Sequence, residues 1–192
     1  TSIGLDHLDL LGDSLIAIAG EKAGIMKPGV PLISGVEDAG VATFLRERVR
    51  ARSCPLVQLK DDAGADLPAL ALPGSYARRN ATLALEALRA SNIRRRDGRP
   101  LDHDASVRAI ARTTIPGRAE WYPSPVPTLL DGAHNPAAFA SLAEVFAQRL
   151  ASGEPWALVF GAMSNKDFAG MLSELERALP PPSQVLLVQL PE

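Results

Sequence analysis

The sequence has little of several features that would point to whole classes of protein. Its 192 residues include one cysteine, Cys54, which excludes an internal disulfide framework and a zinc site built from cysteines. Aromatic residues make up only 5%, and the 20 basic and 22 acidic residues form no long run of either sign, which argues against nucleic-acid binding. No apolar run is long enough to cross a bilayer, and no signal-peptide pattern opens the chain. We therefore expect a cytoplasmic protein that binds neither nucleic acid nor membrane.

What is present predicts an α/β fold in two segments. Apolar periodicity predicts helices at 13–24, 38–52, 75–90, 104–113, 136–151 and 167–178, and strands at 30–35, 55–60, 128–130, 156–160 and 184–189. In the helix at 75–90, one apolar face is expected from Leu83, Ala84, Ala87 and Leu88. Ile115-Pro116-Gly117 interrupts the chain, so we place a domain boundary after residue 114. The strand–helix alternation beyond it predicts a parallel sheet.

Two residues near the start are candidates for metal chemistry. His7 follows a strand-like stretch, where loops of α/β proteins build ligand sites. A lone histidine is more often structural than a ligand. Lys22 ends an apolar helix, and partial burial there would lower its pKa and let the neutral amine form a carbamate with carbon dioxide. Alternatively, Lys22 pairs with Glu21 or stabilises the helix C-terminus.

The residues around this pair form a long, ungapped pattern. Residues 1–7 (TSIGLDH), 11–13 (LGD) and 18–29 (IAGEKAGIMKPG) resemble the signature of folylpolyglutamate and dihydrofolate synthases, which belong to the Mur ligase superfamily. The resemblance implies that His7 binds a magnesium ion and that Lys22 becomes carbamylated. A carbamate would place an anionic oxygen beside the metal, and oxygen is the ligand that magnesium prefers.

Three further motifs resemble the same family and imply nucleotide contacts. Residues 72–81 (LPGSYARRNA) resemble Gly-x-His-Gln-x-x-Asn-Ala and place Asn80 near adenine, although Tyr76 and Ala77 replace the histidine and glutamine. The Pro-Gly-Arg at 116–118 implies that Arg118 reaches the ATP phosphates, a task suited to a guanidinium fork. Residues 130–136 (LDGAHNP) imply that Asp131 contacts the ribose or base, with His134 beside it.

Simpler roles exist for each of these residues. Asn80 alone would be a solvated or capping side chain, and Arg118 alone would be a surface turn residue. Asp131 in a strand–turn–helix junction would form an Asx-turn next to a helix cap. The loop at 161–167 (GAMSNKD) also resembles a family loop, in which Lys166 either faces the active site or is simply solvated.

The resemblance also implies parts that this sequence does not contain. The family's Gly-x-x-Gly-Lys-Ser/Thr phosphate loop and a glutamate metal ligand are not found in it. We therefore expect residues 1–114 to be the end of a P-loop-type central ATPase domain. Residues 115–192 would be a truncated, Rossmann-like C-terminal domain with a parallel sheet, so that both domains are incomplete.

The implied activity of the parent protein is ATP-dependent ligation of L-glutamate to folate or dihydropteroate through an acyl phosphate. It would use ATP and Mg²⁺ and act as a monomer when complete, while this fragment would be inactive alone. Two other readings remain open: a non-catalytic nucleotide-binding remnant, and a Mur-type ligase of another acid.

Overall fold

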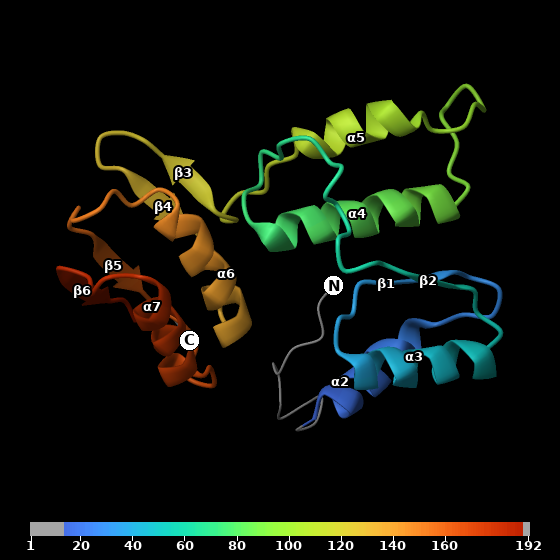
Figure 1. Ribbon diagram of the computed structural model, residues 1–192, viewed down its shortest axis with the longest axis horizontal. Helices are drawn as coiled ribbons and strands as arrows, with labels where there is room; N and C mark the ends of the chain where they lie inside the picture. The colour runs from blue at the N-terminus through green and yellow to red at the C-terminus, as the bar shows by residue number, and fades with distance from the viewer. Residues whose placement is uncertain (1–13, 190–192) are drawn as a thin grey trace. The chain divides into compact units, whose positions relative to one another are not determined.

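The computed structural model describes residues 14–189, which divide into two compact units (Figure 1). Unit 1 comprises residues 14–71 and 76–113. Unit 2 comprises residues 72–75 and 114–189. The assignment of these units to Mur ligase domains stays a prediction at this point. Helices and parallel strands occur in both, which confirms the α/β class.

Unit 1 begins with helices packed beside a short parallel sheet. Its first elements are α2 (Leu15–Lys22), the 3-10 turn η1 (Ala23–Ile25), β1 (Leu32–Ser34), α3 (Ala39–Ala51) and β2 (Leu56–Gln58). The Ser14 hydroxyl accepts the Ala17 N–H and so begins α2, while Asp38 caps α3 in the same way. β1 pairs with β2 in parallel. A core between α2, α3 and the strands is formed by Ala19, Ala23, Met26, Val41, Leu45 and Val49.

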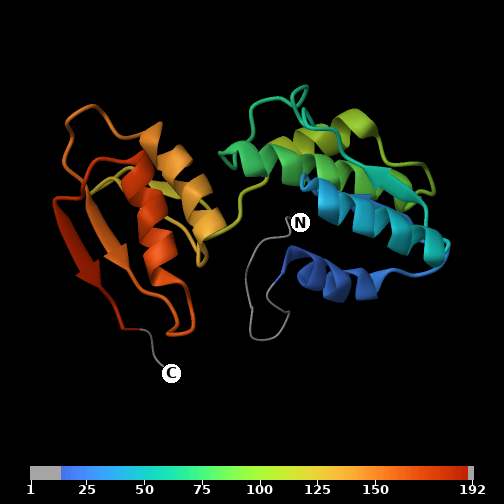
Figure 2. The same ribbon diagram turned by 60° about the horizontal axis from the view of Figure 1, so that its bottom comes forward.

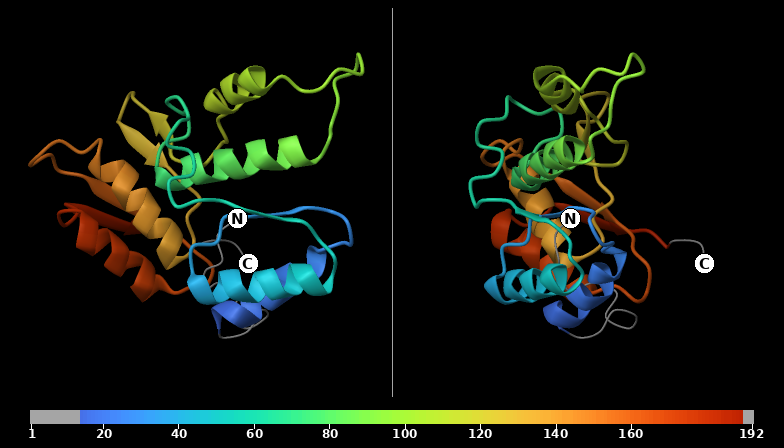
Figure 3. Two further views of the ribbon diagram at one scale, coloured as in Figure 1. Left: turned by 45° about the vertical axis from the view of Figure 1, so that its right-hand side comes forward. Right: turned by 90° about the vertical axis from the view of Figure 1, so that its right-hand side faces the viewer.

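The rest of unit 1 consists of α4 (Ser75–Ala90) and α5 (His103–Ala111), which run side by side in Figures 1 and 3. The buried stripe of α4 consists of Ala77, Ala81 and Leu85, four residues apart. This differs from the predicted face, because Ala84 and Ala87 are exposed. The Arg78 guanidinium donates to the carbonyls of Gly64 and Leu67, both over 2.8 Å, and thereby holds the preceding loop against the helix.

Unit 2 contains one antiparallel and one parallel strand pair. Its elements are β3 (Glu120–Tyr122), β4 (Thr128–Leu130), α6 (Pro136–Ala147), β5 (Ala157–Phe160), α7 (Phe168–Ala178) and β6 (Gln184–Leu187). β3 pairs with β4 antiparallel, and β5 pairs with β6 in parallel. The sequence did not predict β3, and the expected parallel ladder is formed, within residues 14–189, by β5 and β6 without β4.

The two helices of unit 2 cover one face of the β5–β6 pair, as Figure 2 shows. Their shared core is formed by Phe139, Ala143, Phe160, Met171, Leu175 and Leu179. The helices begin at the same end, because a Cβ on Gly170 would come within 2.9 Å of the Pro136 ring. The loops that precede α6 and α7 are therefore neighbours.

Trp156 has a packing role in unit 2. Its ring meets Phe146 edge-to-face at 5.3 Å between centroids, and its indole N–H donates to the Pro180 carbonyl. No helix between residues 14 and 189 combines the length and apolarity that a bilayer crossing needs.

Candidate functional site

The Pro-Gly-Arg turn and the end of β4 are joined by backbone and carboxylate hydrogen bonds. The Gly132 N–H donates to the Gly117 carbonyl over 2.8 Å. The Asp131 carboxylate accepts the Ala119 N–H over 2.6 Å. Because β3 pairs with β4 just beyond these contacts, the two motifs form one rigid corner of unit 2. The structure thus brings Arg118, Asp131 and His134 into the same corner.

The Arg118 guanidinium lies over Gly132. Its Nη1 is 3.4 Å from the position that a Cβ on Gly132 would occupy. The side chain is exposed, and its guanidinium forms no hydrogen bond or ion pair with any residue in the described part of the chain. A guanidinium in this state keeps all five of its donors available for a phosphate or carboxylate.

Asp131 holds backbone on both sides of the turn. One carboxylate oxygen accepts from Ala119, and the other accepts the Ala133 N–H over 2.7 Å, which makes an Asx-turn. The Asn135 side chain then caps α6 by accepting the Ala138 N–H, with Pro136 in the first turn. Asp131 therefore has the simpler role considered for it, an Asx-turn next to a helix cap. A nucleotide contact by Asp131 stays a prediction.

His134 projects from the same loop and is exposed. Its Nδ1 lies 2.9 Å from the Gly132 carbonyl oxygen. Since a carbonyl can only accept, this contact requires the proton to be on Nδ1. The loop backbone therefore fixes the orientation of the ring.

Glu120 belongs to the same corner, although the sequence motifs did not identify it. Its carboxylate accepts the Gly117 N–H over 2.8 Å. This hydrogen bond, followed by one from the Tyr122 hydroxyl, lowers the pKa of Glu120 below its usual value of 4.5, while the shared contact raises the pKa of Tyr122 above 10.0. The sequence offered one signal that could have identified Glu120. When residues 120–122 are read as a strand, the side chains of residues 120 and 122 point to the same face.

The remaining predicted residues lie elsewhere. Lys22 is in the last turn of α2 and is exposed, so the expected partial burial is wrong. Asn80 is exposed on α4. Both belong to unit 1, and their roles stay predictions. His7 lies outside the described residues. Among residues 14–189, no three histidine, cysteine or acidic side chains cluster as metal ligands would.

The loop after β5 contributes a helix cap. The Asp167 carboxylate accepts the Gly170 N–H over 2.8 Å and so begins α7. Lys166 precedes it, and its predicted place near the active site stays a prediction.

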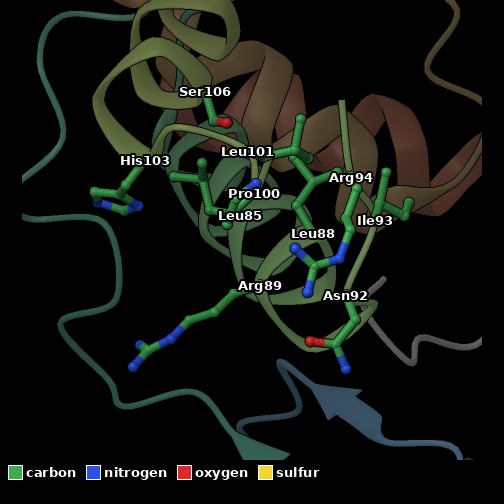
Figure 4. A pocket seen from close by; sticks show the side chains of 10 residues that line it. All are labelled: Leu85, Leu88, Arg89, Asn92, Ile93, Arg94, Pro100, Leu101, His103 and Ser106. Atoms are coloured by element: carbon green, nitrogen blue, oxygen red, sulfur yellow. The ribbon is translucent and has the colours of Figure 1, made fainter. Parts of the chain in front are cut away.

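Unit 1 contains an open pocket that shares no residue with the predicted site. Its volume is about 550 Å³, and Figure 4 shows its lining at the ends of α4 and α5. Apolar groups and basic groups both contribute, among them Leu85, Leu88, Leu101, Arg89, Arg94 and His103.

Comparison with known proteins gives a consistent picture. Residues 117–180 match the family described as Mur ligase, glutamate ligase domain. The chain is 30% identical to the dihydrofolate synthase/folylpolyglutamate synthase of Bacillus subtilis, covering 92% of the chain and 45% of that protein. It is also 30% identical to the folylpolyglutamate synthase of Lacticaseibacillus casei, over 100% of the chain and 48% of that protein.

Solved structures show the same similarity as the sequence comparisons. An FPGS–AMPPCP–folate complex matches with a TM-score of 0.79 and 25% identity, over 99% of this chain and 50% of that one. E. coli FolC with ADP matches with a TM-score of 0.79 and 27% identity, over 100% and 47% respectively. The chain spans about half the length of these relatives. In sequence and fold the chain is therefore similar to about half of the folylpolyglutamate and dihydrofolate synthases, and its residues 117–180 match the Mur ligase, glutamate ligase domain.

Proposed function

We propose that the protein of which this chain forms part is an ATP-dependent ligase that joins L-glutamate to folate or dihydropteroate. A substrate carboxylate would attack the γ-phosphorus of ATP, giving an acyl phosphate and ADP. The glutamate amine would then attack the acyl carbon, releasing phosphate and forming an amide. The named ligands of the solved relatives, which include folate, ADP and AMPPCP, support this choice of substrates.

The observation that carries the proposal is the exposure of the Arg118 guanidinium and its position over Gly132. Its guanidinium is exposed, lies over Gly132, and has no counter-ion among the described residues, although two carboxylates belong to the same corner. Those carboxylates bind backbone N–H groups instead. This arrangement suits Arg118 to contact ATP phosphates, whose negative charge grows on the leaving oxygens during transfer. His134, with its ring held by the Gly132 carbonyl, would lie next to the nucleotide.

The other assignments rest on motif resemblance. Asn80 would read the adenine, because an amide offers both a donor and an acceptor. His7 would bind Mg²⁺, and carbamylated Lys22 would place an oxygen anion nearby. The described residues do not by themselves form a magnesium site, so we derive no catalytic step through the metal.

The test is a product analysis with the complete protein of the source organism. It should be incubated with ATP, glutamate and either tetrahydrofolate or dihydropteroate, and the products weighed by mass spectrometry. A folate extended by one glutamate residue, together with equimolar ADP, is the expected result. ATP turnover with a different acid would favour a Mur-type ligase, and binding without turnover would favour a nucleotide-binding remnant.

A further inference from the structure

The turn that carries Arg118 has three consecutive backbone N–H groups, and all three are occupied. The Gly117 N–H donates to the Glu120 carboxylate over 2.8 Å. The Arg118 N–H donates to the Ile115 carbonyl over 3.1 Å. The Ala119 N–H donates to the Asp131 carboxylate over 2.6 Å. Successive N–H groups of this kind often bind phosphate directly, but here the protein's own acceptors fill them.

The backbone of the turn also has an unusual conformation. Gly117 has φ +68°, which glycine adopts readily, and Ala119 has φ +46°, which an L-residue adopts only at a cost. Ala119 is 5% exposed. A strained residue persists where its surroundings over-determine it, and the two carboxylate contacts on either side of Arg118 do so.

These contacts hold the backbone from which the Arg118 side chain projects. The N–H groups on both sides of Arg118 are bound to carboxylates, and its guanidinium lies beside Gly132, which has no side chain in the way. The carboxylate of Glu120 would neutralise Arg118 if the two formed an ion pair. Instead it binds the Gly117 N–H, so the guanidinium stays available.

We propose that Glu120 is a positioning residue for Arg118, holding the 115–119 turn in the conformation that presents the guanidinium to an ATP phosphate. This rests on the proposed phosphate contact of Arg118. Asp131 supports the other side of the same turn. The lowered pKa of Glu120 agrees with this role, since it keeps the carboxylate ionised as a strong acceptor at neutral pH.

The experiment uses the full 192-residue chain with Glu120→Ala, Glu120→Gln, Arg118→Ala and the double variant Glu120→Ala/Arg118→Ala. Glu154→Ala is the matched control, because Glu154 also accepts a backbone N–H three residues before it, that of Ala151, in the same unit. Three properties are measured: hydrogen exchange of the Gly117 amide by NMR, NMR relaxation of the Arg118 Nε–H, and the dissociation constant for ATP by calorimetric titration.

We expect Arg118→Ala to weaken ATP binding about tenfold, the size of one lost charge-assisted contact, and Glu120→Ala to weaken it by about three- to fivefold. The double variant should match Arg118→Ala alone, because Glu120 acts through Arg118. Glu120→Gln keeps an acceptor oxygen and should restore binding, while Glu154→Ala should leave it unchanged. Gly117 should exchange faster only in the two variants that carry Glu120→Ala.

Two results would overturn the positioning role. One is a further loss of affinity when Glu120→Ala is added to Arg118→Ala. The other is unchanged Gly117 exchange in Glu120→Ala. If Arg118→Ala binds ATP as tightly as the unmodified chain does, the phosphate contact itself fails. Gly117 exchange and the NMR relaxation of the Arg118 Nε–H then still decide whether Glu120 orders that side chain.

Discussion

The Asp131 carboxylate accepts the N–H of Ala119 over 2.6 Å, which ties the end of β4 to a residue 12 positions earlier in the chain. Ala119 is buried and has a left-handed backbone conformation, so water cannot readily replace this acceptor. Together with the hydrogen bond from the Gly132 N–H to the Gly117 carbonyl, the contact links the Pro-Gly-Arg turn to the motif at 130–136.

Asp131→Ala should destabilise unit 2 by about 1–3 kcal/mol, because it leaves the buried Ala119 N–H unsatisfied. Both tryptophans, Trp121 and Trp156, lie in unit 2, so their fluorescence during urea unfolding reports this unit alone. Glu176→Ala is the control, since Glu176 is exposed on α7 and should change stability by less than about 0.5 kcal/mol. Equal unfolding midpoints for the two variants would contradict the role of the contact.

Arg79→Ala should destabilise unit 1 more than Glu37→Ala does. The Arg79 Nε donates to the Gly35 carbonyl over 2.8 Å, and its Nη1 is 2.7 Å from the Glu37 carboxylate. The arginine side chain is 18% exposed and the glutamate 69%. A partly buried guanidinium–carbonyl bond of this kind contributes about 1.5–3 kcal/mol, whereas an exposed ion pair contributes about 0.2–1 kcal/mol.

Hydrogen exchange across residues 75–90 would measure this difference, because unit 1 contains no tryptophan. A larger effect of Glu37→Ala would mean that the ion pair, and not the bond to Gly35, holds α4 beside the end of β1.

The fold was predictable where local periodicity was strong. The helix predicted at 75–90 has the same bounds in the structure, but its buried stripe was assigned to the wrong residues. Alanines occur on several faces of this helix and mark no face by themselves, so burial was decided by what packs against it. β3 was missed because a three-residue strand between Gly117 and Pro123 has no stable local pattern and exists through pairing with β4.

The candidate site was predictable only in part, for a related reason. Motif resemblance located Arg118, Asp131 and His134, and the structure brings these three together. Glu120 was not singled out, because its role depends on a turn that folds Gly117 back onto the strand that follows. The partial burial considered for Lys22 was wrong because it was inferred from the apolar character of the helix, and α2 directs that residue to solvent.

The stability of unit 2 should depend on the ionisation of Glu120. Because folding lowers the pKa of this group, its contribution is complete above the usual value of 4.5 and is lost as the pH falls through the lower, folded-state pKa. The unmodified chain should therefore exceed Glu120→Gln in stability at pH 7, and the gap should close in acid. Tryptophan-monitored urea unfolding across this pH range measures it.

Tyr122→Phe separates the two causes of the shift. The Gly117 N–H is the larger cause, so the pKa of Glu120 should rise in this variant and yet remain below its usual value. A carboxyl ¹³C titration of Glu120 would report it. A return to the usual value would assign the shift to Tyr122 instead. Since the pKa of Tyr122 is raised, its own contribution should persist to alkaline pH and fade only above its usual value of 10.0.

Gly132→Val should weaken ATP binding with little change in stability. Gly132 is exposed and its φ is not left-handed, so a side chain strains no backbone there. A Cβ would already touch the Arg118 Nη1 at 3.4 Å, and the two further methyl groups of valine would push the guanidinium aside. Gly132→Ala is the graded control, because its single methyl meets Arg118 at an ordinary contact distance and should reduce affinity less.

Calorimetric titration with ATP and tryptophan-monitored unfolding would be compared for both variants. A larger loss of ATP affinity in Gly132→Val than in Gly132→Ala, at constant stability, would locate the phosphate contact above Gly132. Equal ATP affinity in the two variants would place the contact elsewhere.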